Sequence, residues 1–175
     1  KHVGAVRRAL GVRSVFNMLG PMVNPARAKR QLIGVYDTLL MAPMAEALES
    51  LGSTGMIVCG MDGLDEVSPT HPTYVISVDR SKESFTRVTP DTFGIKCSVN
   101  LTPGETIADN AAILASALKG EEECRSEALV PNAAVTLWLS GVAPTLAECA
   151  TVSRDVIHSG KAWQKLCDWV EVSRS

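Results

Sequence analysis

The stretch QLIGVYDTLLMAPMAEALESLGSTGMIVCG, residues 31–60, decides the fold class of this 175-residue chain. Both ends of the stretch, residues 31–36 and 54–59, are apolar and β-prone, the profile of buried strands. The segment between them carries apolar residues at helical spacing, can be capped by Asp37 or Thr38, and can end at Gly52. A strand, a helix and a strand in this order predict a parallel strand pair with a right-handed crossover, and hence an α/β fold.

Further strands and helices are predicted downstream of this unit. Two shorter strands are expected at residues 73–78 and 84–88, and they can pair antiparallel. Apolar residues at helical spacing then predict four helices, with glycines after the first and second of them. These helices cover residues 107–118, 124–139, 145–158 and 161–170. The expected sheet is mixed and mostly parallel, with helices flanking it.

Composition indicates an ordinary globular protein. Hydrophobic residues make up 46% and charged residues 21% of the chain, and the net charge is -2. This balance argues against disorder, and the spread of Lys and Arg argues against a nucleic-acid-binding surface. The longest apolar stretch, residues 133–143, is too short to span a bilayer. The five cysteines include no C-x-x-C pair, which favours reduced thiols in a cytoplasmic protein over a disulfide framework or a zinc site.

The candidate chemistry lies in the acidic turn GMDGLDE, residues 60–66, which follows the second predicted strand. Open α/β sheets bind ligands at the carboxyl ends of their strands. Gly60 and Gly63 allow the backbone to turn tightly and to approach a ligand. Asp65 and Glu66 are adjacent carboxylates of the kind that Mg²⁺ shares with substrate phosphates, and Asp62 is a third acid nearby. On spacing alone, a solvated acidic turn is the commoner explanation of the pattern, because acidic turns are frequent.

Two features before the first strand each have two interpretations. Gly20-Pro21 and Asn24-Pro25 are turn signals, and the loop they mark is either a plain connection or one that lines a cleft or acts as a hinge. Residues 1–10 read as a basic helix and residues 13–18 as a further helical turn. The basic face of the first helix is either solvated or supplies an arginine that binds a carboxylate in bidentate fashion.

Several motifs together resemble one enzyme family. VRRALG at residues 6–11, FNMLGPMVNPA at residues 16–26 and GLDEVS at residues 63–68 occur in the order and spacing of anthranilate phosphoribosyltransferase. The segments at residues 110–114, 132–134 and 159–162 fit the same family. The chain departs from it at Cys59, where many relatives carry histidine, and at Pro131, where they usually carry an aliphatic residue.

The resemblance implies a fold like that of class II pyrimidine nucleoside phosphorylases, with a small helical domain hinged to a large α/β domain. Residues 1–175 are then expected to form the carboxyl-terminal part of the large domain. The small helical domain, which supplies the dimer contact in the family, and the glycine-rich phosphoribosyl pyrophosphate loop would both lie upstream. The 175-residue segment alone is therefore expected to be inactive.

The family transfers phosphoribose from phosphoribosyl pyrophosphate to the amino group of anthranilate in tryptophan biosynthesis, with Mg²⁺ and with release of pyrophosphate. By resemblance, Arg7 takes the position of an anthranilate-binding arginine, and Asp65 and Glu66 take those of the Mg²⁺ ligands. Gly20 and Pro21 match a hinge and substrate-channel segment. No catalytic residue is assigned as a general base. The full-length protein is expected to be a cytoplasmic homodimer with no nucleic-acid or membrane partner.

Two alternatives belong to the same fold. One is a non-catalytic relative that binds nucleic acid, and the intact GLDE at residues 63–66 and the acidic net charge speak against it. The other is a nucleoside phosphorylase, which residues 17–26 fit poorly. A salt-dependent DNA-binding assay separates the first alternative from an enzyme.

Overall fold

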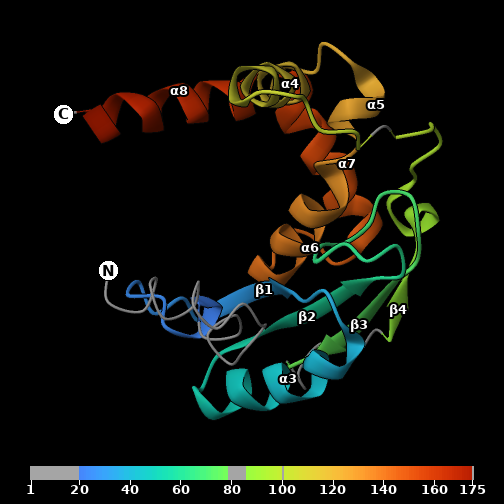
Figure 1. Cartoon of the computed structure of the whole chain (residues 1–175), viewed down its shortest axis with the longest axis vertical. Coiled ribbons are helices and arrows are strands. Elements are labelled where there is room, and N and C mark those ends of the chain that lie inside the picture. Colours follow the sequence, from blue (N-terminus) through green and yellow to red (C-terminus); the bar gives the residue numbers. More distant parts are fainter. Residues whose placement is uncertain (1–19, 79–85, 100, 175) are drawn as a thin grey trace.

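The structure, a computed structural model, describes residues 20–78, 86–99 and 101–174. Its centre is a four-stranded sheet in the order β1-β2-β3-β4, with helices on both faces (Figure 1). The strands are β1 (Arg30–Gly34), β2 (Thr54–Gly60), β3 (Thr73–Ser77) and β4 (Arg87–Val88). β1 and β2 are parallel, whereas β2 pairs antiparallel with β3, and β3 with β4.

The predicted strand–helix–strand unit is confirmed. A short 3-10 helix, η1 (Thr38–Leu40), and α3 (Met41–Ser50) connect β1 to β2. The side chain of Asp37 caps η1 by accepting the Leu39 N–H at 2.9 Å. The α/β class with a mixed sheet is confirmed too. Antiparallel pairings nevertheless outnumber the parallel one in these four strands, because the β2–β3 connection contains no crossover helix and the chain reverses direction.

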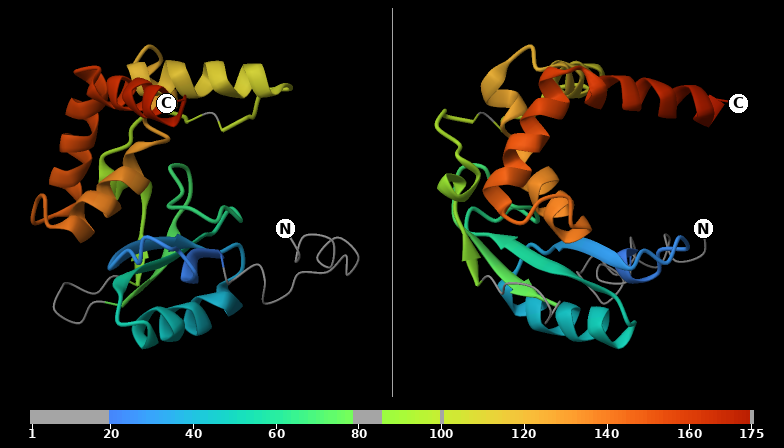
Figure 2. Two further views of the ribbon diagram at one scale, coloured as in Figure 1. Left: turned by 90° about the vertical axis from the view of Figure 1, so that its left-hand side faces the viewer. Right: turned by 180° about the vertical axis from the view of Figure 1, so that it is seen from behind.

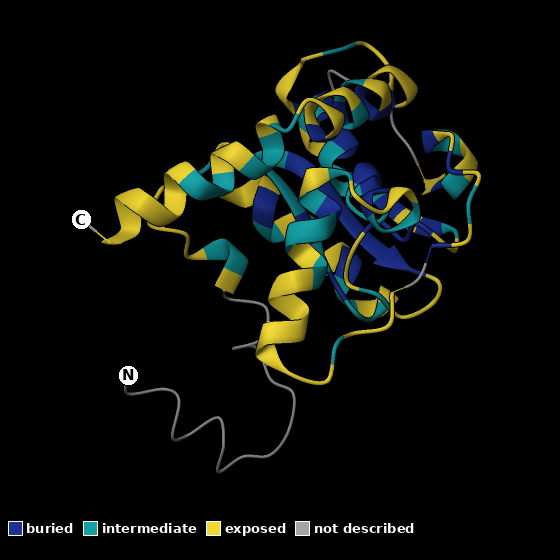
Figure 3. Ribbon diagram, turned by 90° about the horizontal axis from the view of Figure 1, so that it is seen from above, coloured by how far each residue is buried: buried dark blue, intermediate teal, exposed yellow. Residues whose placement is uncertain are grey.

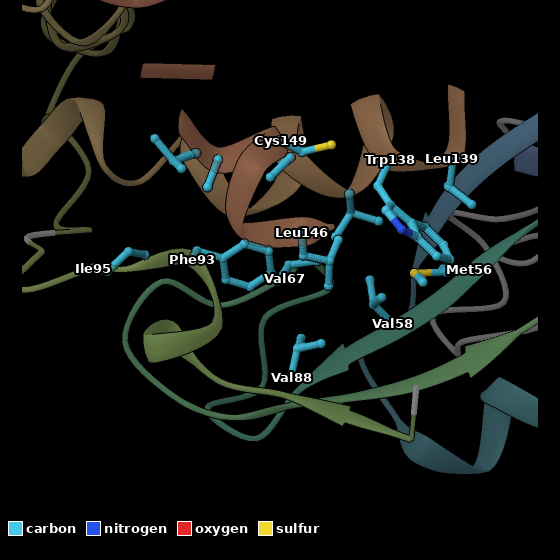
Figure 4. Close-up of a cluster of buried hydrophobic side chains, with 14 of the residues drawn as sticks. Met56, Val58, Val67, Val88, Phe93, Ile95, Trp138, Leu139, Leu146 and Cys149 are labelled. Carbon is cyan, nitrogen blue, oxygen red and sulfur yellow. The ribbon is translucent and has the colours of Figure 1, made fainter. Parts of the chain in front are cut away.

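An apolar layer lies on each face of the sheet. Both layers include residues of β2, because successive side chains of a strand point to opposite faces. Met56 and Val58 belong to the larger core, which Figure 4 shows between the sheet and residues of the later helices such as Trp138 and Leu146. Ile57 and Cys59 belong to the second core, against α3. The strand is thus buried on both faces, which explains why its sequence is a continuous apolar run.

Five helices follow the sheet, and they form two groups (Figures 1 and 2). α6 (Val130–Ser140) covers the face of the sheet opposite α3, and α7 (Leu146–His158) packs on α6 and rises away from the strands. α4 (Ile107–Lys119), α5 (Glu123–Ser126) and α8 (Lys161–Arg174) lie farther from the sheet. A 3-10 helix, η2 (Pro90–Phe93), precedes them. The end of α8 projects from the body and is mostly exposed (Figure 3). None of the helices in the described ranges is long and apolar enough to cross a membrane.

Some predicted boundaries are wrong. The helix predicted over residues 124–139 is divided into α5 and α6 by a tight turn, in which Ala128 and Leu129 donate to carbonyls only three residues back. Pro131 has no N–H to continue the α5 ladder but fits the first turn of α6. α8 continues beyond Val170 to Arg174.

The amino-terminal predictions are only partly testable. Gly20, Pro21 and Met22 are helical rather than part of a loop, which the fixed φ of proline permits, and a turn follows at Val23. The predicted helices at residues 1–10 and 13–18 lie outside the described residues. The strand predicted at residues 84–88 is reduced to β4, because only Arg87 and Val88 pair with β3 and residues 84 and 85 are outside the described part.

Candidate functional site

The acidic turn begins where β2 ends. The Leu64 carbonyl accepts the Gly60 N–H at 2.8 Å, and the Gly60 carbonyl accepts the Gly63 N–H at 3.0 Å. Gly63 has φ 89°, which a residue with a side chain rarely adopts. A Cβ atom on Gly60 would lie 2.5 Å from Asp62 Oδ1. The two glycines therefore let the turn fold back on the strand end, as the sequence predicted.

Asp62 braces this turn from within. Its Oδ2 accepts hydrogen bonds from Ser68 Oγ at 2.6 Å and Thr70 Oγ1 at 3.2 Å, and His71 Nδ1 lies 3.4 Å away. Its Oδ1 accepts the Leu64 N–H at 3.3 Å. Burial alone would raise the pKa of Asp62, but the hydrogen bonds from Ser68, the backbone and Thr70 outweigh it and lower the pKa below its usual value. Asp62 is therefore engaged in holding the turn.

Asp65 lies directly over the carboxyl end of β1. A Cβ atom on Gly34 would come 1.5 Å from the Asp65 carbonyl oxygen, so only glycine permits this approach. Asp65, Gly34 and Pro21 line one cavity of about 180 Å³, together with Val35 and Tyr36 among others. The structure thus brings two predicted site residues, Asp65 and Pro21, to the same place at the sheet edge where α/β proteins bind ligands.

Glu66 is exposed at the end of the turn and is contacted from α6. Asn132 Nδ2 donates a hydrogen bond to Glu66 Oε2 at 3.3 Å. Among the residues that the structure describes, no group bonds the other carboxylate oxygen, Oε1. Asn132 therefore bonds Oε2 of Glu66, and no described residue competes with a ligand for Oε1.

The two carboxylates fit a shared magnesium site better than a closed one. In the described ranges, no three side chains of His, Cys, Asp or Glu come together as a complete metal site. Asp65 and Glu66 are both exposed, and both supply hard oxygen ligands. Mg²⁺ usually keeps several waters and is bound by one or two carboxylates plus substrate phosphates. The donor set is therefore suitable for a cation that arrives with a phosphate-bearing ligand.

The remaining predicted site residues are less well placed. Gly20 is exposed and does not line the cavity that Pro21 lines. Arg7 lies outside the described residues, so its predicted contact with a carboxylate stays a prediction. Sequence reasoning noted Asn132 only as part of a family motif and did not assign it a function. The signal for its function is a hydrogen bond between residues 66 positions apart, which no local pattern contains.

A family profile matches most of the chain. The family described as "Glycosyl transferase family, a/b domain" matches residues 1–163. The chain therefore belongs to this family, and the resemblance proposed from its motifs is confirmed.

The chain is also similar to individual proteins and solved structures. An anthranilate phosphoribosyltransferase of Endomicrobium trichonymphae is 39% identical over 99% of this chain and 52% of its own length. The crystal structure of the Thermus thermophilus anthranilate phosphoribosyltransferase superposes with a TM-score of 0.90 at 37% identity, covering 99% of this chain and 52% of that one. The Saccharomyces cerevisiae enzyme in complex with phosphoribosyl pyrophosphate and Mg gives 0.79 at 31% identity, with coverage of 94% and 48%. The chain thus spans about half the length of its relatives.

Proposed function

We propose that the protein transfers phosphoribose from phosphoribosyl pyrophosphate to anthranilate, a step of tryptophan biosynthesis. The observation that carries this proposal is the position of Asp65 beside Pro21 at the carboxyl end of β1. There the acidic turn faces the segment that matches the substrate channel of the family. The yeast relative, which is 31% identical to this chain where the two align, has been solved with phosphoribosyl pyrophosphate and Mg.

In the proposed site, Asp65 and Glu66 would hold the Mg²⁺ that accompanies the pyrophosphate group. The cation, when bound, supplies positive charge that offsets the charge gathering on the leaving pyrophosphate. The exposed position of both carboxylates supports this assignment, because the pyrophosphate must reach them from solvent. Residues 1–175 would form the carboxyl-terminal part of the large α/β domain, and the glycine-rich loop that holds the other end of the substrate would come from upstream. A homodimer is part of the same proposal.

Arg7 is proposed to orient the acceptor. Its planar guanidinium can donate two parallel hydrogen bonds to the carboxylate of anthranilate. The C1′–oxygen bond to pyrophosphate breaks, the anthranilate nitrogen bonds to C1′, and the nitrogen then releases a proton to solvent. Because an aromatic amine is neutral at pH 7, the step needs positioning and electrostatic stabilisation rather than a strong base. No general base is assigned.

The direct test follows anthranilate fluorescence with the complete gene product. We expect the fluorescence to fall only when both phosphoribosyl pyrophosphate and Mg²⁺ are present, and excess chelator to stop the change. Asp65→Ala or Glu66→Ala should lower kcat by about two orders of magnitude. Asp168→Ala, an exposed carboxylate on α8, is the matched control and should keep wild-type turnover. A wild-type protein that leaves the fluorescence unchanged with Mg²⁺ present would refute the proposed function.

The role of Arg7 has a separate test. Arg7→Ala should raise the KM for anthranilate by roughly tenfold or more and should affect kcat less. The reason is that the Arg7 guanidinium is proposed to bind the anthranilate carboxylate equally well in the ground state and in the transition state. An unchanged KM would remove the role proposed for Arg7 while leaving that of the acidic turn intact.

A further inference from the structure

Asn132 connects α6 to the chain just after the acidic turn with three hydrogen bonds. Its Oδ1 accepts the Val67 N–H at 2.9 Å, and its Nδ2 donates to the Val67 carbonyl at 3.2 Å. The amide thus engages both backbone groups of Val67, whose side chain is fully buried in the larger core. The same Nδ2 donates to Glu66 Oε2 at 3.3 Å. One side chain therefore holds both the backbone after Glu66 and the Glu66 carboxylate.

This arrangement fixes how Glu66 can bind a cation. The amide N–H occupies Oε2 and leaves the second oxygen, Oε1, without a hydrogen bond from any described residue. The hydrogen bond favours the orientation in which Oε2 faces Asn132 and Oε1 is the oxygen offered to a cation. Pro131 stabilises the position of Asn132, because it is buried in the first turn of α6 and restricts the backbone there. Hydrogen bonds to ligating carboxylates of this kind tune metal affinity.

We propose that Asn132 is a positioning residue that orients Glu66 so that Oε1 binds the Mg²⁺ of a magnesium–pyrophosphate complex. This inference rests on the proposed function and extends it to α6. It explains why an amide is suited to the position. A carboxylate there could still accept the Val67 N–H, but it would lose both donors and would stand opposite Glu66 as a like charge.

The test compares two asparagines that bridge backbone in the same way. Asn110, on α4, accepts the Gly104 N–H at 3.1 Å and donates to the Gly104 carbonyl at 3.1 Å, but it bonds no carboxylate of a described residue. Asn110→Asp is therefore the matched control for Asn132→Asp. Both changes remove an amide that donates to a backbone carbonyl. Only Asn132→Asp also removes a hydrogen bond to Glu66.

The measurement is Mn²⁺ binding by the complete gene product in the presence of pyrophosphate, with free Mn²⁺ counted by electron paramagnetic resonance. Mn²⁺ is suitable because it also prefers oxygen ligands. We expect Asn132→Asp to weaken Mn²⁺ binding by about 10- to 100-fold, while Asn110→Asp binds as wild type does. The Mg²⁺ concentration for half-maximal turnover should rise in parallel, with the KM for anthranilate unchanged.

The outcomes separate the inference from the proposed function. If wild type binds Mn²⁺ and Asn132→Asp binds it equally well, the role of Asn132 is overturned and the proposed function stands. If both variants lose binding in proportion to their loss of thermal stability, Asn132 is only structural and the inference is also overturned. A wild-type protein that binds no Mn²⁺ with pyrophosphate contradicts the proposed function itself.

Discussion

At the scale of single residues, the acidic turn contains carboxylates with different tasks. Asp62, Asp65 and Glu66 are all exposed as whole residues, but the side chain of Asp62 is only 15% exposed and is bonded by two hydroxyl groups. Three acids that look equivalent in the sequence GMDGLDE are thus divided into two proposed cation ligands and one brace. The division follows from hydrogen-bond donors at Ser68 and Thr70, which surround only Asp62.

The lowered pKa of Asp62 leads to a pH-dependent prediction. A carboxyl group whose pKa is lower in the folded state adds stability above its unfolded pKa of about 3.9, and this stability is lost as the pH falls through the folded pKa. Asp62→Asn should therefore lower the free energy of unfolding by about 1 kcal/mol at pH 6 to 7. The difference from wild type should shrink below about pH 3.9. Urea denaturation of the complete gene product at several pH values measures both effects.

The control for this experiment is Asp155→Asn, an exposed carboxyl on α7. It should change stability little at any of these pH values, since surface substitutions away from special contacts have small effects. A loss of stability in Asp62→Asn that stays constant down to acidic pH would show that the carboxylate charge is not what braces the turn.

The sequence predicts the place of the site residues better than their partners. Asp65 and Glu66 follow the second strand, as predicted, because an apolar run followed by glycines is a local pattern. The engagement of Asp62 and the contact of Asn132 with Glu66 were not predicted, since each depends on side chains brought together by folding. Asn132 in particular arrives on a helix whose start the periodicity misplaced.

At the scale of elements, the break between α5 and α6 shows the same limit. The apolar spacing runs through residues 124–139, but the chain turns at Glu127, whose carboxylate is buried. Arg154 of α7 reaches this carboxylate with Nε and one terminal nitrogen, each at 2.6 Å, and also donates to the Phe93 carbonyl at 2.7 Å. One guanidinium therefore joins α5, α7 and η2. This contact with a partner 27 positions away holds the turn in addition to the local effect of Pro131, and helical periodicity expresses neither.

The hydrogen bonds of Arg154 to Glu127 and Phe93, called the arginine clamp below, predict stability losses that differ between substitutions. Arg154→Met should lower the free energy of unfolding by about 3 kcal/mol, because it leaves a buried carboxylate without its partner. Arg154→Lys should cost less, since an ammonium keeps the charge but not the two-armed contact. The double variant Arg154→Met with Glu127→Leu should recover part of the loss by removing the unpaired charge. Chemical denaturation of these three variants and of the single variant Glu127→Leu measures the series, and a double variant as unstable as the sum of its two single changes would contradict the clamp.

At the scale of the whole molecule, the described part of the chain leaves apolar surface uncovered. A groove of about 450 Å³ lies between α4, α6, α7 and α8, with an almost wholly apolar lining that includes Leu118, Leu137 and Val156. β1 pairs with β2 on one side, and no described strand pairs with its other edge. Uncovered apolar surface and an unpaired strand edge both favour association with another chain. The relatives, about twice as long, have further chain with which such surfaces can be covered.

These surfaces predict how the 175-residue chain behaves when it is produced by itself. We expect it to self-associate, with a mass by size-exclusion chromatography and light scattering that rises with concentration. Val156→Lys, at a groove residue that is 38% exposed, should shift the chain toward the monomer. Val142→Lys, at a residue 53% exposed and not among the groove residues, makes the same chemical change and should leave the association as it was.

Because the proposed site needs a second loop for the pyrophosphate, the same preparation should turn over no anthranilate, whether monomeric or associated. A monomeric wild-type chain would show that the groove is not an associating surface, and turnover by this chain would show that the acidic turn is not half of a site but a sufficient one.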